Sequence, residues 1–304
     1  MATSHKIESD AGLNFRMLIT GLLLVVLYAI IVGVLLSLGV STAFVLILCG
    51  AMLFSQYFFS AKIAMFSMHA HVVTPEEEPQ LHAIVDRLCL LADMPKPLVG
   101  VAETDIPNAF ATGRSPKAAV VCATRGIMNR LSDEELEAVL AHELSHVAHR
   151  DVAVMTIASG VGMLAGLIGR MAMWGAMLGG GDSRNNNDNN GAIELVVWLL
   201  SIVISIVAYL LTMALSRYRE LAADRSGAIL IGKPSVLASA LVRITGDIGR
   251  IPRTDLRKAE GMNAFFFAPA LAGGTAASLF STHPSLEKRL DALSKLEREL
   301  NGHG

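Results

Sequence analysis

The strongest constraint on this chain is a run of 45 residues, Met17–Ala61, that contains no charged side chain. A helix rises about 1.5 Å per residue and needs about 20 apolar residues to cross a bilayer. The run therefore predicts two transmembrane helices, Met17–Leu38 and about Ser41–Ser60, joined by a minimal turn around Gly39. A signal peptide would have a shorter apolar core followed by a polar mature region, so an uncleaved anchor is predicted.

A second apolar region predicts another pair of spans, which brings the total to four. Val152–Gly169 is uncharged, and Leu195–Leu215 is a cleaner span of 21 residues; a Gly- and Asn-rich loop at 179–191 separates them. A charge such as Arg170 is costly within a span unless it snorkels or faces protein. A soluble hairpin buried in a protein core is therefore the alternative for 152–215.

Basic residues flank the predicted spans on one side of the membrane. They precede the first and third spans and follow the second and fourth: Lys6, Arg16, Lys62, Arg150, Arg217 and Arg219. By the positive-inside rule these flanks are cytoplasmic. The net charge of −2, with no basic stripe, argues against a nucleic-acid partner. Three cysteines, one of them inside a span, fit a reducing compartment.

Two polar stretches, 69–150 and 217–304, are left to form a domain outside the bilayer. A helix is predicted from Thr74 to about Asp93, because Thr-Pro-Glu is a helix-start signal. Leu98–Ala102 and Ala118–Ala123 are short β-like runs with a turn signal between them. They predict a small antiparallel sheet.

The next helix is predicted over about Asp133–Arg150, because Ser132–Glu135 has the sequence of a capping box. In its second half His142 and His146 are four residues apart, so they project from the same face and can share one Zn²⁺. Glu143 lies beside them, where it can take a proton from a zinc-activated water that attacks a peptide carbonyl. This H-E-x-x-H arrangement is typical of metalloproteases, although a solvated helical face can carry it by chance.

A catalytic zinc site needs a third protein ligand. His149 shares the face but follows His142 by seven residues, about 10.5 Å along the helix axis, so one ion cannot reach both. Glu220 is the better candidate. Glu220 and Asp224 form an ExxxD pair on one helical face, where Asp224 could orient a ligand imidazole. A solvated charged turn is the alternative for this pair.

The chain resembles the M48 zinc metallopeptidases, and within them the HtpX-type bacterial membrane proteases. The resemblance runs from the N-terminal spans through AHELSHVAHRD (141–151), RELAADR (219–225) and THPSLEKRL (282–290), so it covers nearly the whole chain. Together with the predicted spans it implies a mainly α-helical integral membrane protein. Four transmembrane helices would accompany a zincin-like (gluzincin) α+β catalytic domain with its small antiparallel sheet.

The resemblance assigns the site residue by residue. His142, His146 and Glu220 match the ligands of one zinc ion per chain, Glu143 matches the catalytic base, and Asp224 matches the carboxylate behind a ligand histidine. The expected domains are a transmembrane hairpin at 1–61, the first part of the protease domain at 62–150, a second hairpin at 151–216 and the rest of the protease domain at 217–304.

Two further segments are matched through the resemblance, and a third is left without an assignment. His283, with Arg289 six residues later, is similar to an element that approaches the metal, where His283 could donate to the tetrahedral oxyanion. A solvated helix start is the alternative there. Pro107–Gly113 is similar to an edge strand to which an extended peptide could pair. Residues 246–279 match no regular element and could form a flap.

The resemblance implies quality control at the cytoplasmic face of the bacterial inner membrane. The substrates would be misfolded or damaged membrane proteins, or unfolded proteins, and the lipid bilayer would be the other partner. Two alternatives are a catalytically silent membrane scaffold or chaperone and a tethered peptidase of soluble substrates. The retained Glu143 argues against the first, because zinc binding alone needs no base there.

Overall fold

The computed structural model describes residues 11–37, 41–178, 188–248 and 283–302. The expected turn around Gly39, most of the loop at 179–191 and nearly all of segment 246–279 therefore lie outside the described residues. The chain divides into two compact units. We call residues 16–56 and 154–215 the helical unit, and residues 57–153 and 216–304, with the N-terminal residues, the sheet unit.

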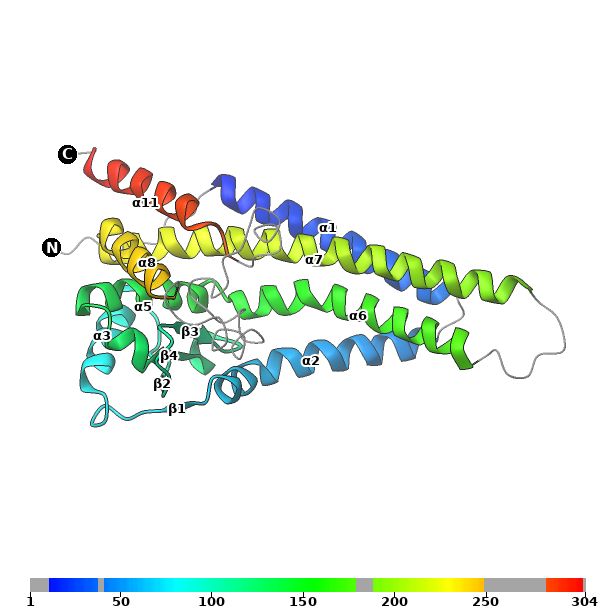
Figure 1. The fold of residues 1–304 in the computed structure, drawn as a ribbon, viewed down its shortest axis with the longest axis horizontal. Coiled ribbons are helices and arrows are strands. Elements are labelled where there is room, and N and C mark those ends of the chain that lie inside the picture. The colour runs from blue at the N-terminus through cyan, green and yellow to red at the C-terminus, as the bar shows by residue number, and fades with distance from the viewer. Residues whose placement is uncertain (1–10, 38–40, 179–187, 249–282, 303–304) are drawn as a thin grey trace. The chain divides into compact units, whose positions relative to one another are not determined.

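Long apolar helices build the helical unit and lie side by side in Figure 1. They are α1 (Ala11–Ser37), α2 (Thr42–Ser67), α6 (Asp151–Leu178) and α7 (Asp188–Ile231). Within the described residues, three segments are long and apolar enough to cross a membrane: Phe15–Gly33, Asp151–Arg170 and Leu195–Ile231. The count of four spans stays a prediction.

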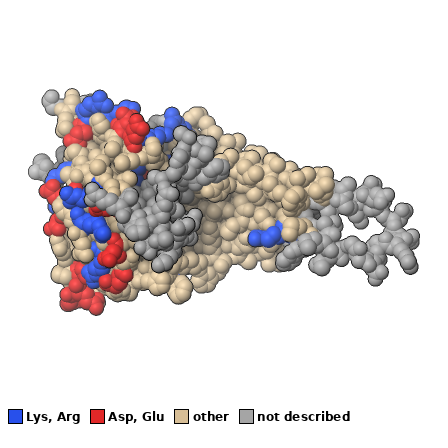
Figure 2. Space-filling view, viewed as in Figure 1, with Lys and Arg blue, Asp and Glu red and all other residues tan. Residues whose placement is uncertain are grey.

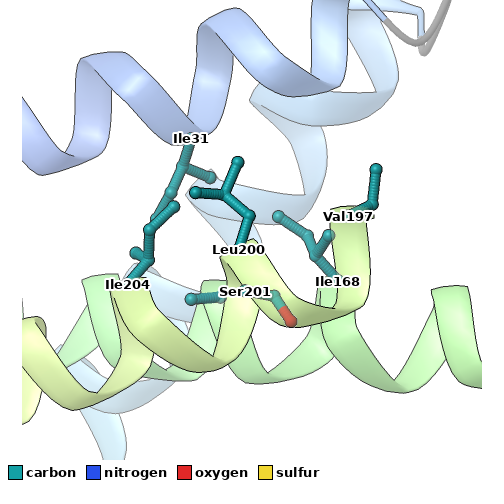
Figure 3. Close-up of a pocket in the computed structure, with 7 residues that line it drawn as sticks. Ile31, Ile168, Val197, Leu200, Ser201 and Ile204 are labelled. Atoms are coloured by element: carbon teal, nitrogen blue, oxygen red, sulfur yellow. The ribbon is translucent and has the colours of Figure 1, made fainter. Parts of the chain in front are cut away.

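Small residues on α6 allow its neighbours in the helical unit to approach closely. A Cβ on Gly160 would lie 2.3 Å from the Tyr28 hydroxyl, and one on Gly169 would lie 2.4 Å from Ser201 Oγ. Such close approach at small residues is typical of helix packing in membranes. A small pocket remains between the helices, with the lining shown in Figure 3: Ile31, Ala165, Ile168, Val197, Leu200, Ser201 and Ile204.

Charged side chains are distributed unequally between the two units. Figure 2 shows acidic and basic groups gathered on the sheet unit, whereas the visible surface of the helical unit is almost entirely uncharged. Many large apolar side chains of the helical unit are exposed, among them Leu22, Val25, Val196 and Val203. An apolar surface of this extent suits contact with lipid rather than water.

The sheet unit contains a four-stranded sheet in the order β1-β2-β4-β3. Its strands are β1 (Ala70–Val72), β2 (Leu98–Ala102), β3 (Ala109–Thr112) and β4 (Val120–Thr124). The predicted antiparallel sheet is wrong in one respect, because β2 and β4 run parallel and the sheet is mixed. The reason is that β3 lies between β2 and β4 in the chain and runs antiparallel to β4. The chain reverses direction before β3 and again after it, so β2 and β4 run the same way.

Helix α3 spans Pro79–Leu91, so the predicted helix start at Thr74 is wrong. Thr74 closes a separate turn, in which its backbone N–H donates to Glu77 Oε2 at 2.7 Å. Proline has no N–H to donate, and it is tolerated in the first helical turn because the N–H groups there have no partner within the helix. Pro79 therefore starts the helix, and the residues before it form the turn.

Helix α5 (Asp133–Ala148) lies in the core of the sheet unit. The predicted capping box is confirmed: Ser132 Oγ accepts from the Glu135 N–H at 3.3 Å, and Glu135 Oε2 accepts from the Ser132 N–H at 3.0 Å. The core residues of α5 pack with those of α8 (Pro234–Ile248) and α11 (Leu286–Asn301). The 3₁₀ helix η1 (Pro116–Ala118) precedes β4, and the short helix α4 (Arg125–Met128) follows it.

Candidate metal centre

The two histidines of α5 face each other across one helical turn, as their four-residue spacing predicts. Their Nε2 atoms are 3.1 Å apart. Their rings meet edge to face at an angle of 87°, with centroids 4.8 Å apart. His142 is buried and His146 is partly exposed. The pair therefore presents two ring nitrogens to one position.

Glu220 of α7 completes the group. Its Oε1 lies 3.4 Å from His146 Nε2, and its Oε2 lies 3.7 Å from His142 Nε2. One ligand atom from each of these three residues lies within 4.8 Å of the other two, as needed to hold a single metal ion. Among the described residues, no other group of three or more His, Cys, Asp or Glu side chains is arranged in this way.

Gly227 allows α7 to come this close to α5. A Cβ at this position would lie 2.7 Å from the backbone nitrogen of His142 and 2.9 Å from its Cα. Both neighbours are backbone atoms, which cannot rotate away as a flexible side chain can. The two helices touch backbone to backbone beside the histidine, which brings Glu220 and Asp224 of α7 to the site.

Each histidine is also bound through its other ring nitrogen. His142 Nδ1 lies 2.9 Å from Asp224 Oδ1. His146 Nδ1 lies 2.5 Å from Asp151 Oδ2, a contact that no spacing rule in the sequence predicts. An ionised carboxylate can only accept hydrogen bonds, so the Nδ1 that faces it carries a proton and Nε2 is the atom left for a metal.

Two arginines neutralise these carboxylates. Arg289 is 2% exposed and donates from both Nε and Nη2 to Asp224, at 2.7 and 2.6 Å. Arg219 Nη2 lies 2.6 Å from Asp151 Oδ2. The structure therefore places Arg289 on Asp224, with its Nη1 3.9 Å from Glu220 Oε2.

Glu143 lies beside the group, in contact with the edge strand of the sheet. Its Oε2 accepts a hydrogen bond from the backbone N–H of Ala111 in β3 at 2.9 Å. β3 is at the edge of the sheet, where the resemblance places a strand beside the cleft. Burial raises the pKa of Glu143 to about 8, with a further increase from Glu220 and opposing effects of His146 and Ala111.

His283 reaches the centre from the segment just before α11. Its Nδ1 lies 2.9 Å from Glu220 Oε2, so a residue 63 positions away in the chain contacts the third candidate ligand. His149, in contrast, is not in the group. It is the C-cap of α5, and its backbone N–H donates to the carbonyl of Ser145.

The chemistry of these side chains fits a zinc ion. Two imidazole nitrogens and a carboxylate converge, and a positive charge among them stabilises the group: a proton on His146 when the site is without metal, or a metal ion. Burial lowers the pKa of His146, but its bonds to Asp151 and Glu220 outweigh burial and raise that pKa to about 10. The site thus attracts positive charge. Two histidines and one carboxylate match the protein ligands of catalytic zinc sites.

The comparisons with known proteins agree over most of the chain. Residues 75–297 match the model of peptidase family M48. A protein named Protease HtpX homolog 2 from Methanosarcina acetivorans is 51% identical over 298 residues, covering 98% of this chain and 99% of its own. Protease HtpX homolog 1 from Streptomyces coelicolor is 50% identical over 296 residues, covering 97% and 96% of the two chains.

Solved structures with a similar fold include one of a protein named Ste24p. The crystal structure of Ste24p from S. mikatae aligns with a TM-score of 0.51 at 16% sequence identity. The alignment covers 93% of this chain but 66% of that longer one. At this identity the likeness concerns the fold alone.

Proposed function

This chain belongs to peptidase family M48, and on that premise we propose that it is a zinc-dependent endopeptidase held in a membrane. The convergence of His142, His146 and Glu220 beside the buried Glu143 carries the proposal. In this proposal the first three residues hold one zinc ion and Glu143 is the catalytic base. A scaffold without catalysis would have no use for an acid–base group at that position.

The chemistry divides between the metal and the protein. Bound zinc would supply a Lewis acid that polarises a peptide carbonyl and lowers the pKa of water to about 7. Glu143 accepts the proton of the attacking water and passes it to the leaving amine.

The edge of the sheet supports a binding mode for an extended peptide. Among the described residues β3 pairs with β4 on one side only, and its Ala111 N–H points to Glu143. A substrate strand laid along the edge of β3 opposite β4 would bring its carbonyl groups to the base and the metal ligands. In this proposal His283, whose Nδ1 contacts Glu220, donates to the oxyanion in the same step.

The sequence supports membrane proteins as substrates. Helix α7 has 44 residues and is about 66 Å long, roughly twice the thickness of a bilayer core, so part of it lies outside the lipid. In this proposal the part outside the lipid is the C-terminal part of α7, because it carries the buried charged residues Glu220 and Asp224. The basic flanks of the predicted spans make that side cytoplasmic. Tethering raises the local concentration of substrates in the same membrane, such as damaged loops and tails.

The test uses full-length protein purified in detergent, with zinc content and casein digestion measured for the wild type and for Glu143→Gln. The variant should keep about one zinc per chain and lose about 10²- to 10⁴-fold in activity. Glu134→Gln is the matched control, because Glu134 is an exposed residue of the same helix. Near-normal digestion by Glu143→Gln would refute the mechanism, and a wild type without zinc would refute the cofactor.

A further inference from the structure

The corner between α5 and α6 brings an unassigned carboxylate to the metal centre. α5 ends at Ala148, and Arg150 adopts a left-handed conformation with φ 55°, which turns the chain sharply. Asp151, the first residue of α6, is thereby directed back toward α5. Its Oδ2 lies 2.5 Å from Nδ1 of His146, five residues earlier in the chain.

Arg219 holds this carboxylate in place. Its Nη2 lies 2.6 Å from the same Oδ2 atom, and both side chains are buried, Asp151 at 3% exposure and Arg219 at 8%. The pair thus presents a carboxylate oxygen, a hydrogen-bond acceptor, to Nδ1 of His146, which leaves Nε2 to face Glu220 at 3.4 Å.

The same arrangement occurs on the other histidine. His142 is backed by Asp224, and Asp224 by Arg289, all buried. The two chains of contacts use different segments, the α5–α6 corner with α7 in one and α7 with α11 in the other. An acidic residue that only favoured the start of α6 would need neither a buried arginine nor a ring nitrogen at 2.5 Å.

We propose that Asp151, held by Arg219, is a positioning residue that fixes the tautomer and the direction of the His146 ring for metal binding. This inference rests on the proposed zinc site. Partners of this kind typically change metal affinity about 10- to 100-fold when they are replaced. Asp151 does not reach a substrate or the metal itself; it acts through His146.

Asp151→Asn is the principal variant, because it keeps the shape of the side chain. Arg219 and His146 contact the same Oδ2 atom, so an amide oxygen in its place would accept from both, while the negative charge that backs the His146 ring would be lost. Asp133→Asn is the matched control, since Asp133 is likewise the first residue of a helix but is exposed. Arg219→Gln tests the second member of the pair.

The measurements are the zinc dissociation constant from competition with a chelator and the absorption spectrum of the Co²⁺-substituted protein, both on the full chain in detergent. Asp151→Asn should weaken zinc binding about 10- to 100-fold and alter the Co²⁺ spectrum. Arg219→Gln should shift both in the same direction, and Asp133→Asn should shift neither. The metal-free proteins should unfold at similar temperatures.

Zinc affinity and Co²⁺ spectrum equal to wild type in Asp151→Asn would overturn the proposal, whatever the unfolding temperature. If that variant does not fold, an unchanged affinity in Arg219→Gln would overturn it equally. His146→Ala separates this failure from failure of the proposed function. If His146→Ala loses zinc but the Asp151 and Arg219 variants do not, the zinc site is supported and the role of Asp151 is refuted. If the wild type binds no zinc, the proposed zinc site itself is refuted.

Discussion

Gly227 of α7 lies directly against the backbone of His142: a Cβ built on the glycine would come within 2.7 Å of the histidine nitrogen. Real Cβ atoms essentially never approach a heavy atom so closely. Gly227 follows Asp224 by three residues and Glu220 by seven, so all three lie near one face of α7. The missing methyl group thus determines how near the two carboxylates come to the histidines.

Gly227→Ala is expected to push α7 away from α5 and to weaken zinc binding by at least tenfold. Overpacking of this kind also costs about 1–3 kcal/mol of stability. Chelator competition and thermal unfolding in detergent measure the two effects. Gly246→Ala is the control, because Gly246 lies in α8 with nothing within 4 Å of its Cβ position. Equal zinc affinity in the two variants would mean that the close approach does not set the site.

The ligand assignment predicts a specific order of zinc affinities. Glu220→Ala and His146→Ala should both lose zinc, because each removes one of the three converging ligand atoms. His149→Ala should keep it, since His149 caps α5 outside the group. Metal titration of the three purified variants measures this. Retention of zinc in Glu220→Ala with loss in His149→Ala would show that the third ligand was wrongly chosen.

The predicted topology can be tested by labelling intact cells with an impermeant maleimide. If 152–215 crosses the membrane and returns, a cysteine at Ser183 should react, because the loop then lies on the side opposite the zinc site. Position 183 is outside the described residues, so this prediction rests on the sequence. A cysteine at Ser132 should not react. Each of the two cysteines is introduced into a variant that lacks the native Cys49, Cys89 and Cys122, so that it is the single reactive thiol. Labelling at 132 but not at 183 would reverse the orientation.

Glu135 is expected to make stability depend on acid pH. Burial opposes ionisation of this carboxylate, but hydrogen bonds from Ser132 and Ser239 and the charge of Arg243 outweigh it and lower its pKa. A carboxyl whose pKa is lowered on folding stabilises the protein above its unfolded value, about 4.3, and the stabilisation is lost as pH falls below it. The wild type should therefore unfold at a higher temperature than Glu135→Gln at pH 6, and the difference in unfolding temperature should disappear as the pH is lowered to 3. A constant gap would contradict this origin.

Local rules predicted the parts of the site that lie on one element. Ser132 and Glu135 specify the start of α5 because both partners of the capping box are three residues apart. The spacing of His142 and His146 then places both rings on one face. Glu220 with Asp224 follows the same helical rule. The resemblance linked these two segments, which are far apart in the chain.

Contacts that depend on tertiary packing could not be predicted in this way. Asp151 reaches His146 only through the left-handed turn at Arg150, and no spacing rule anticipates that conformation in a residue other than glycine. The parallel pairing of β2 with β4 depends on where β3 docks. Gly227 looked like any helical glycine. Its importance comes from the backbone of another helix, which the sequence of α7 does not contain.

The order of the ligands along the chain affects how the protease is made. Glu220 leaves the ribosome 74 residues after His146, and His283 leaves it 137 residues after His146. Both hairpins of predicted spans are synthesised before Glu220. An incomplete chain therefore carries two imidazoles without the carboxylate, too few protein ligands for a catalytic zinc site. We expect a nascent chain arrested before Glu220 to be unable to digest its neighbours at the site of insertion, so that proteolysis begins only in a finished molecule.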